Sequence, residues 1–578
     1  MFAKMRSNVR VSACLFLLLV VCCTCLARST VHDSPGVCDE NDVNVDSVYV
    51  SYDVKSEKFS LRDVMDAQTV AYARYSNCIN STGFAYLTVS TVNDYTYVLN
   101  SSIQAYAAGL AEGYITRGLI DLHFQNTMAG LCEGKSAQCQ GVEKFLRRNL
   151  DWVFKMVEEN PDDSYWYQVR LFYEQLRGIQ DGFDVKPGRI SMEVENVFGL
   201  FLLTHMDDLE DVWASLYGLN STQQDSDHCS VLIKVLQGQD GVKDVLMAHD
   251  TWSSYNTMLR ILKRYDFYLH KVPTASEPVL GHTLTFSSYP GVIISIDDFY
   301  VLSSNMVVTE TTNPVLNDAL YKLIRPESVL ESVRITVANR LAEHGSDWSN
   351  TFSRYNSGTY NNQWMVIDLK QYDPFFSQVL PGFFTVLEQI PGKIHSEDKT
   401  KQLLETSYWS SYNIPYYPDI FKASGLPDMV AKYGDYFSHD NCPRAKIFQR
   451  DQSKVTDIDS LTRLMRYNDY QHDPLSKCNC TPPYSATNAI SARNDLNPVS
   501  GTYPFPQLGF RLEGGIDMKL TSLNIAMDTL TFMAISGPTF DPLPPFQWSK
   551  AVNGSSTLHL GMPDVFNFGP VWFNGTFG

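Results

Sequence analysis

The chain has 578 residues, of which 44% are hydrophobic and 19% are charged, and its formal net charge at pH 7 is −18. A chain of this length can bury roughly three quarters of its unfolded surface, so its core supplies most of its stability. No run of Lys and Arg that would follow phosphates is present, which argues against a nucleic-acid-binding protein. The pI of about 5.1 is compatible with an acidic compartment such as a lysosome.

Residues 1–27 are predicted to be a secretory signal peptide. Three basic residues precede the apolar run LFLLLVVCC, and small residues at 25–27 supply a cleavage site. The apolar run is shorter than the ~20 residues of a spanning helix, and no later run approaches that length. We therefore expect no transmembrane segment and a mature protein in the lysosomal lumen or secreted. Removal of the three cations lowers the net charge to −21.

The residues from about 100 to 220 show a helical pattern. Apolar residues recur at helical spacing in four segments, at 101–124, 145–157, 165–180 and 208–219. The sequence NPDDS ends the second of these helices, and its Asp162, Asp163 or Ser164 can cap the third. Residues 28–228 are therefore predicted to form a largely helical N-terminal chain that ends in a polar linker at 220–228.

After residue 228 the pattern changes to that of β-strands. We predict strands at 230–236 and 244–252, a helix at 255–269, three strands within 283–312 and a strand from Gln363. The segment QGQDGVK, between the first two strands, contains the glycines of a turn. Residues 229–578 are predicted to carry most of the strands of the fold.

Six acceptor sequences for N-linked glycosylation accompany the signal peptide. They are at Asn80, Asn100, Asn220, Asn479, Asn553 and Asn574. Together with the signal peptide they indicate passage through the secretory pathway.

Eight cysteines remain after the signal peptide is removed, and most should pair in an oxidising lumen. Cys132 and Cys139 flank a short loop and are easily bridged. Cys478 and Cys480 flank one residue, and either form a tight bridge or pair elsewhere. Without a second ligand pair at useful spacing this Cys-x-Cys is poor evidence for zinc. We found no motif for a metal or a cofactor, and we expect neither.

The segment DSDHCSVLIKV places Cys229 between the polar linker and the first strand. One interpretation is a buried or disulfide-bonded structural cysteine. The other is an N-terminal nucleophile made by cleavage of the bond between His228 and Cys229. A thiol has a pKa of ~8.5 and needs a base, and a freed α-amine, with a pKa of about 7.7–8.0, would supply it on the same residue. Strain in the linker would favour attack of the thiol on the His228 carbonyl.

The segments DHCSVLIKV and HDTWSSYNTMLRILKRYDF (249–267) resemble the phospholipase B-like family of lysosomal proteins. Further blocks follow in order at 309–317, 356–370, 443–452, 464–480, 490–498 and 536–549. The family is similar to N-terminal-nucleophile hydrolases. The resemblance therefore implies an α+β fold with a four-layer αββα sandwich and self-cleavage before Cys229. It also implies two chains that stay associated after cleavage, and it allows a homodimer.

The resemblance implies roles for several further residues. Cys229 is the nucleophile, Asp250 orients its α-amine, and His249 polarises the thiol or the developing charge. Asn356, in NSGTYNNQW, donates to the oxyanion of the tetrahedral intermediate, the alternative being a turn residue before a strand.

An arginine near the nucleophile would lower the pKa of the thiol, and Arg450, or alternatively Arg444, matches it. The alternative for either arginine is an ordinary ion pair. Trp252 is expected in the core or in a pocket wall.

The implied activity is hydrolysis of acyl ester bonds of phospholipids through a thioester on Cys229. The alternatives are an amidase acting on acyl-amide substrates, a processed luminal binding protein without turnover, and an uncleaved secreted protein.

Overall fold

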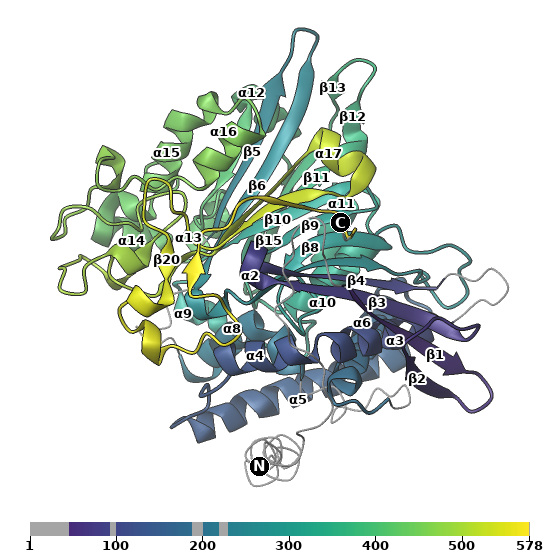
Figure 1. The fold of residues 1–578 in the computed structure, drawn as a ribbon. Helices are drawn as coiled ribbons and strands as arrows, with labels where there is room; N and C mark the ends of the chain where they lie inside the picture. The colour runs from purple at the N-terminus through teal and green to yellow at the C-terminus, as the bar shows by residue number, and fades with distance from the viewer. Residues whose placement is uncertain (1–44, 93–99, 188–199, 219–228, 577–578) are drawn as a thin grey trace.

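The computed structural model describes residues 45–92, 100–187, 200–218 and 229–576 (Figure 1). The predicted signal peptide, the acceptor Asn220, the linker 220–228 and the predicted cleavage residue His228 lie outside this part of the chain. Among the helices described, none combines the length and the apolar character needed to cross a membrane.

The larger of two main sheets has eleven strands within the described residues. In order across the sheet they are β15 (Lys393–Asp398), β14 (Phe384–Ile390), β11 (Asn362–Asp368), β10 (Met306–Thr312), β9 (Phe299–Leu302), β8 (Thr283–Ser288), β7 (Arg260–Asp266), β4 (Phe84–Thr91), β3 (Thr69–Cys78), β1 (Asp46–Asp53) and β2 (Lys58–Arg62). Neighbouring strands are antiparallel except β4 and β7, which are parallel. This parallel pair joins the N-terminal strands to the strands that follow residue 229.

The second sheet contains the strand that begins at Cys229. Its strands in order are β16 (Tyr408–Ser411), β5 (Cys229–Gln237), β6 (Val242–Ser254), β18 (Asp517–Ser522), β19 (Phe532–Ser536) and β22 (Val571–Phe573), with β17 (Glu513–Gly515) also paired to β6. Strands β5 and β6 form a long hairpin that projects from the body of the molecule in Figure 1. The predictions of two strands and a turn at this place agree with the structure.

Side chains on β5 alternate between two hydrophobic cores, because successive residues of a strand point to opposite faces. Val231 and Ile233 belong to the main core, which β5 shares with the larger sheet. Leu232 belongs to a second core on the outer face, together with Phe448 and Leu461. The two sheets therefore pack face to face, and odd-numbered residues at the start of β5 face the larger sheet.

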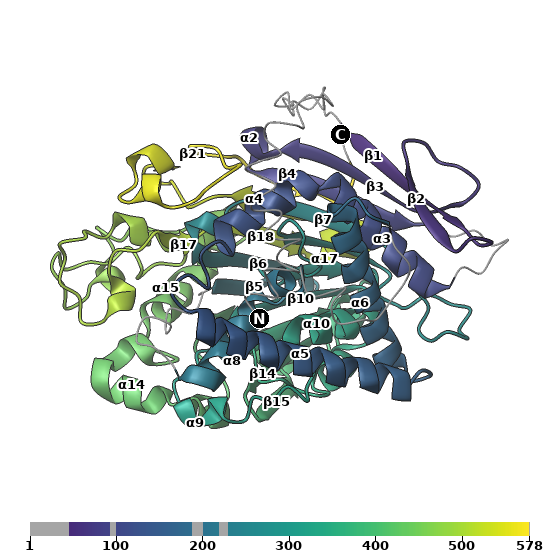
Figure 2. The ribbon, with the colours of Figure 1, turned by 90° about the horizontal axis from the view of Figure 1, so that it is seen from below.

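Helices cover the outer faces of both sheets (Figures 1 and 2). Those on the side of the larger sheet include α3 (Ser101–Ile115), α5 (Ser136–Glu159), α6 (Ser164–Phe183), α8 (Met206–Tyr217), α10 (Glu331–Leu341) and α11 (Gly345–Phe352), with α4 (Arg117–Thr127) between α3 and α5 in the chain. Those on the side of the second sheet include α14 (Leu426–Tyr433), α15 (Pro443–Asp451) and α16 (Ile458–Met465). The result is a mixed α/β protein.

The helices predicted before residue 220 agree with the structure, and their caps explain where two of them begin. Asp163 accepts hydrogen bonds from the backbone N–H groups of Tyr165 and Trp166, and so caps α6. Asn100 accepts from Ser102 N at the start of α3. Strands β1 to β4, which precede these helices, were not predicted, so the N-terminal part also contributes strands to the larger sheet.

The helix predicted over 255–269 is wrong, because this segment contains the central strand β7. Its register pairs it with β4 on one side and β8 on the other. Arg260 and Lys263 are fully buried in this strand and form ion pairs. Because these charged residues are buried, the segment lacks the alternation of apolar and polar residues that would have indicated a strand. Its apolar residues have a spacing that is compatible with a helix.

The structure pairs Cys132 with Cys139 and Cys478 with Cys480, the two candidate disulfides. Cys229 and Cys442 carry thiols. Of the glycosylation acceptors, Asn80, Asn100, Asn479 and Asn553 are exposed and Asn574 is partly exposed, so each is accessible.

Candidate active site

Cys229 is the first residue of β5, and its buried side chain faces the larger sheet. The register of the β5–β6 hairpin pairs Cys229 with Thr251 and Val231 with His249, so these side chains share the face of Cys229. Strand β10 of the larger sheet contributes Glu310. One donor atom each from Cys229, His249 and Glu310 lies within 4.8 Å of the other two.

The backbone of Cys229 is held by two polar side chains from distant parts of the chain. Its N–H donates to Asn413 Oδ1 at 2.8 Å, and Arg444 Nη1 donates to its carbonyl oxygen at 2.5 Å. Arg444 Nη1 also donates to Asn413 Oδ1 at 2.9 Å. Asn413 Nδ2 in turn donates to Thr312 O, at the end of β10. These contacts fix the position of the main chain at the start of β5.

Asn413 has a positive φ of 65°, a conformation that asparagine adopts more readily than most residues. Arg444 belongs to the first turn of α15, and its guanidinium lies 4.4 Å from the ring centroid of Trp252. Trp252 Nε1 donates to Ile490 O. Trp252 therefore supports Arg444 and also forms part of a pocket wall, as the sequence suggested.

The structure places the other arginine candidate in an ion-pair cluster. Arg450 contacts Asp451 at 2.6 Å and Asp473 at 2.9 Å, and its side chain is 39% exposed. These contacts raise the pKa of Arg450, with the hydrogen bond to Asp451 as the largest cause. Arg444, the alternative in the sequence, is the arginine that contacts Cys229.

Asp250 and Asn356 are not brought to the thiol of Cys229. Asp250 lies between His249 and Thr251 on β6 and therefore points to the opposite face of the sheet. Burial raises the pKa of Asp250 well above its usual value, and the nearby Arg466 offsets this only in part. Asn356 Oδ1 accepts from Gly358 N at 2.8 Å, and its Nδ2 donates to Ile390 O. Asn356 thus has the contacts of a turn residue before a strand.

Cys229 lines a small pocket with about 370 Å³ of empty space. Its walls come from both sheets and from the helical side, at Met206, Asp207, Thr251, Trp252, Ser253, Thr257, Tyr289, Ile296, Thr312 and Tyr360. A second pocket of about 710 Å³ has Asn413 and Arg444 in its wall. The remaining wall of this second pocket is largely apolar and includes Leu316, Tyr412, Ile414, Leu426, Met429, Phe437 and Cys442. Of these two pockets, the first is lined by Cys229 itself, and the second is lined by the two residues that hold its backbone.

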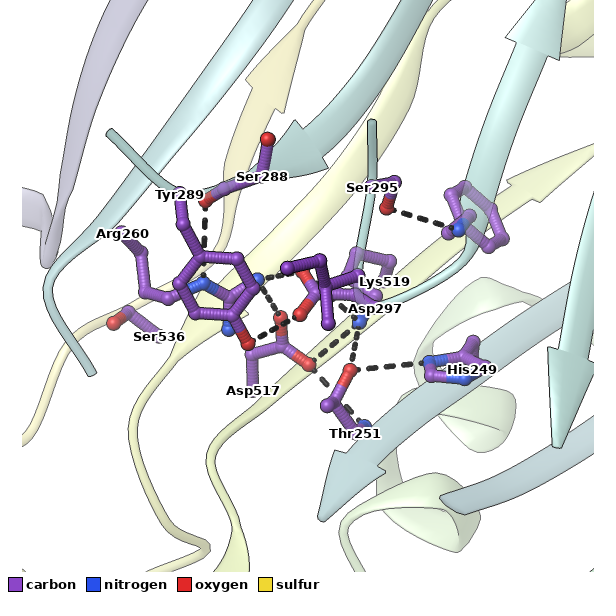
Figure 3. A network of polar contacts seen from close by, with 12 residues as sticks. His249, Thr251, Arg260, Ser288, Tyr289, Ser295, Asp297, Asp517, Lys519 and Ser536 are labelled. Carbon is purple, nitrogen blue, oxygen red and sulfur yellow. Dashed lines mark hydrogen bonds and ion pairs between the residues drawn. The ribbon is translucent and has the colours of Figure 1, made fainter. Parts of the chain in front are cut away.

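A network of buried charges supports the face of β6 that carries His249 and Thr251 (Figure 3). Lys519 donates to Thr251 Oγ1 and to Asp517 Oδ1. Arg260 contacts both Asp517 and Asp297. Burial opposes the ionisation of Asp517, but Lys519 and Arg260 together lower its pKa to about 2, so the carboxylate stays charged.

The imidazole of His249 is neutral in this setting. Burial is the largest cause that lowers the pKa of His249 well below its usual value, and the charge of Lys519 acts in the same direction. Nδ1 of His249 lies 3.3 Å from Thr251 Oγ1, whereas Nε2 is buried without a hydrogen-bond partner. Burial thus disfavours a protonated ring at this position, and the neutral ring keeps one nitrogen outside the contact with Thr251.

Tyr360, in the pocket of Cys229, is anchored by a buried acid. Its hydroxyl donates to Asp298 Oδ2 at 2.7 Å and also contacts Ile296 O. Burial raises the pKa of Asp298 to about 8, although the hydrogen bonds from Tyr360 and Tyr300 act in the opposite direction. Asp298 is therefore protonated in an acidic compartment.

Because the pKa of Asp298 is raised on folding, it contributes stability at low pH that is lost as the pH rises through about 8. Asp298→Asn removes this ionisation, keeps the side-chain shape, and tolerates the positive φ of 45°. We expect the unfolding temperature of the variant to fall less than that of the wild type between about pH 6.5 and about pH 8. Thermal unfolding at a fixed scan rate measures this. An equal decrease in both proteins would contradict the assignment.

Sequence reasoning did not identify Asn413, Glu310, Thr251 or Lys519. The position of the Thr251 side chain could have been deduced from the predicted hairpin. Side chains alternate between the two faces of a strand, so Thr251 lies on the same face as His249 and Asp250 lies on the other. Glu310 lies in the block TETTNPVLN, but no local signal marks it as a partner of Cys229. Asn413 and Lys519 come from segments that only the three-dimensional fold brings to β5.

A family model described as Phospholipase B matches residues 71–573. The chain therefore belongs to the phospholipase B-like family, as the sequence resemblance predicted. It is 47% identical over 530 residues to phospholipase B-like 2 of Mus musculus, which covers 90% of this chain and 87% of the mouse protein. It is 46% identical to phospholipase B-like 2 of Homo sapiens, with 90% and 88% covered, and 42% identical to phospholipase B-like 1 of Caenorhabditis elegans, with 88% of each covered.

Proposed function

We propose that this protein is a luminal acyl hydrolase whose nucleophile is Cys229, made an N-terminal residue by self-cleavage of the bond to His228. The observation that carries the proposal is the setting of Cys229. A buried thiol opens a strand, lies within 4.8 Å of His249, and has its backbone nitrogen bonded to Asn413. The side chains that bind this backbone, Asn413 and Arg444, come from distant parts of the chain and fix the end of the strand that carries the thiol.

The fold supports an N-terminal-nucleophile hydrolase of the αββα type. Two sheets pack face to face with helices on their outer sides, and the candidate nucleophile is the first residue of a strand. Cleavage before such a residue gives a new N-terminus at the end of a sheet strand, between the two sheets. The N-terminal chain contributes β1 to β4 to the larger sheet, so the two chains remain associated after cleavage.

Self-cleavage requires a base other than the nitrogen of Cys229, because this nitrogen is still part of an amide. In our proposal His249 takes the thiol proton only transiently, because a donor atom of its ring lies within 4.8 Å of the sulfur. The sulfur attacks the carbonyl carbon of His228, a C–S bond forms, and the C–N bond to Cys229 breaks as the nitrogen receives the proton. Water then hydrolyses the thioester, which leaves a carboxyl group on residue 228 and a free thiol and amine on Cys229.

In turnover the free α-amine serves as the base. Asn413 Oδ1 accepts a hydrogen bond from this nitrogen and orients it, the role that the sequence assigned to Asp250. The amine takes the thiol proton, the sulfur attacks the acyl carbonyl, and the protonated amine returns the proton to the leaving alcohol. Hydrolysis of the acyl thioester then releases the acid. Arg444, which contacts the carbonyl of Cys229, places a cation beside the reacting residue.

The apolar pocket next to Asn413 and Arg444 favours an acyl chain as the substrate group. Its Leu, Ile, Met and Phe walls suit a hydrocarbon chain, and its lining includes Asn413 and Arg444, which hold the backbone of Cys229. The family description points to the ester bonds of phospholipids. Acyl amides would present the same chain and carbonyl, so the test must compare both bonds.

Trapping of the acyl intermediate tests the proposal. The purified protein is mixed with a fatty-acyl phospholipid or the matched fatty-acyl amide, quenched in acid, and digested for mass spectrometry. We expect an acyl adduct on the peptide that begins at Cys229, and faster turnover of the ester. Burial raises the pKa of Cys442 to about 11, so this thiol should carry no acyl group and serves as an internal control. Absence of an adduct with either substrate would favour a binding protein.

A further inference from the structure

We infer that Cys229, His249 and Glu310, called here the thiol cluster, form a binding site for a zinc-like divalent cation. The sequence predicted no metal site, because the three residues come from three strands and share no spacing motif. The fold brings one donor atom of each within 4.8 Å of the other two. All three side chains are buried, with exposed fractions of 3% for Cys229 and 0% for the other two.

The donor set selects the class of metal. A thiolate, an imidazole and a carboxylate are the three ligand types that Zn²⁺ uses, whereas Ca²⁺ and Mg²⁺ prefer oxygen ligands alone. Around a tetrahedral zinc ion, bond lengths of 2.0–2.3 Å place the ligand atoms about 3.3–3.8 Å apart. The thiol cluster therefore needs side-chain movements of no more than about 1.5 Å to close on the ion. The pocket lined by Cys229 leaves room for water as a fourth ligand.

The surroundings of His249 support its role as a ligand. Nδ1 is engaged with Thr251 Oγ1, and Nε2 is buried without a hydrogen-bond partner, so Nε2 is available to a metal. Thr251 is itself held by Lys519. A metal-bound imidazole usually has its second nitrogen in a hydrogen bond of this kind, which fixes the orientation of the ring.

The charge balance also favours a dication. Ionised Cys229 and Glu310 would together bring two negative charges into a buried site. A divalent cation neutralises both. Lys519, which holds Thr251, is itself compensated by Asp517 at 2.7 Å and by Asp297 at 3.8 Å. A bound ion would cover the sulfur of Cys229, so metal binding and nucleophilic attack by this thiol exclude each other.

Titration of the full-length purified protein with Co²⁺ and Zn²⁺ tests the site. We expect one equivalent to bind, with the near-ultraviolet absorption of a cobalt–thiolate bond, and we expect Zn²⁺ to displace Co²⁺. His249→Ala and Glu310→Gln should each weaken binding by more than about tenfold. Asp250→Asn is the matched control, because Asp250 is adjacent on β6 but points to the opposite face. It should bind Co²⁺ like the wild type.

A second measurement needs no variant and therefore does not depend on how the variants fold. Zn²⁺ should protect Cys229 of the wild-type protein from alkylation, and a chelator should restore the reaction. The inference is overturned if the wild type shows no cobalt–thiolate absorption, or if Zn²⁺ does not slow alkylation. It is also overturned if both cluster variants fold and bind Co²⁺ as tightly as the Asp250→Asn control. None of these readouts depends on acyl hydrolysis.

Discussion

Replacement of Cys229 by alanine should leave one uncleaved chain and lower acyl hydrolysis by a factor on the order of 10⁶, the loss seen when an enzyme loses its nucleophile. The sulfur is the only atom of this residue that can attack the carbonyl, and without cleavage no α-amine is produced. Gel electrophoresis after maturation gives the number of chains, and release of fatty acid from the phospholipid substrate gives the activity.

Cys229→Ser is the informative companion variant. A hydroxyl is a weaker nucleophile than a thiol, so we expect slow cleavage and a small residual activity. The side chain of serine is close in size to that of cysteine, which keeps the packing at the start of β5. Wild-type activity in the alanine variant would refute the role of Cys229 as nucleophile.

Arg260→Met should destabilise the fold by about 3–5 kcal/mol, because it removes one partner from a buried ion network. Arg260 is fully buried and contacts Asp297 and Asp517, so both carboxylates would lose a compensating charge. Methionine retains much of the apolar volume of the arginine stem. The measurement is the unfolding temperature of the variant and of the wild type at one scan rate.

Arg354→Met is the control for that prediction. The ion pair of Arg354 with Asp163 is 38% exposed on both sides, and exposed pairs contribute less than about 1 kcal/mol. The unfolding temperature of this variant should therefore stay close to that of the wild type. Equal decreases in the two variants would contradict the structural importance of the Arg260 network.

The sequence predicted the parts of the fold whose local pattern agrees with their burial. Helix α5 buries one apolar face, and NPDDS separates it from α6, which Asp163 caps. Strands β5 and β6 alternate between two cores around a glycine-containing turn. Strand β7 was missed because Arg260 and Lys263 are buried in ion pairs that only the tertiary structure supplies.

The candidate site was predictable where it depends on the β5–β6 hairpin and not elsewhere. Cys229 and His249 were identified from the sequence, and the hairpin register places them on one face. Asn413 and Glu310 belong to other strands or loops, and their contribution depends on how the two sheets pack. The sequence favoured Arg450 over Arg444, but Arg444 is the arginine that contacts Cys229. The right choice depends on which turn of α15 faces Cys229, and the sequence does not show this.

The N-terminal residue of the mature C-terminal chain tests the central claim most directly. Sequencing of the purified mature protein should give CSVLIKV for the wild type and no such sequence for Cys229→Ala. Trimming of the linker by another protease would remove residues before 229 in both proteins, and so would not produce this difference. A mature wild-type protein in which residues 228 and 229 are still joined by a peptide bond would contradict the account.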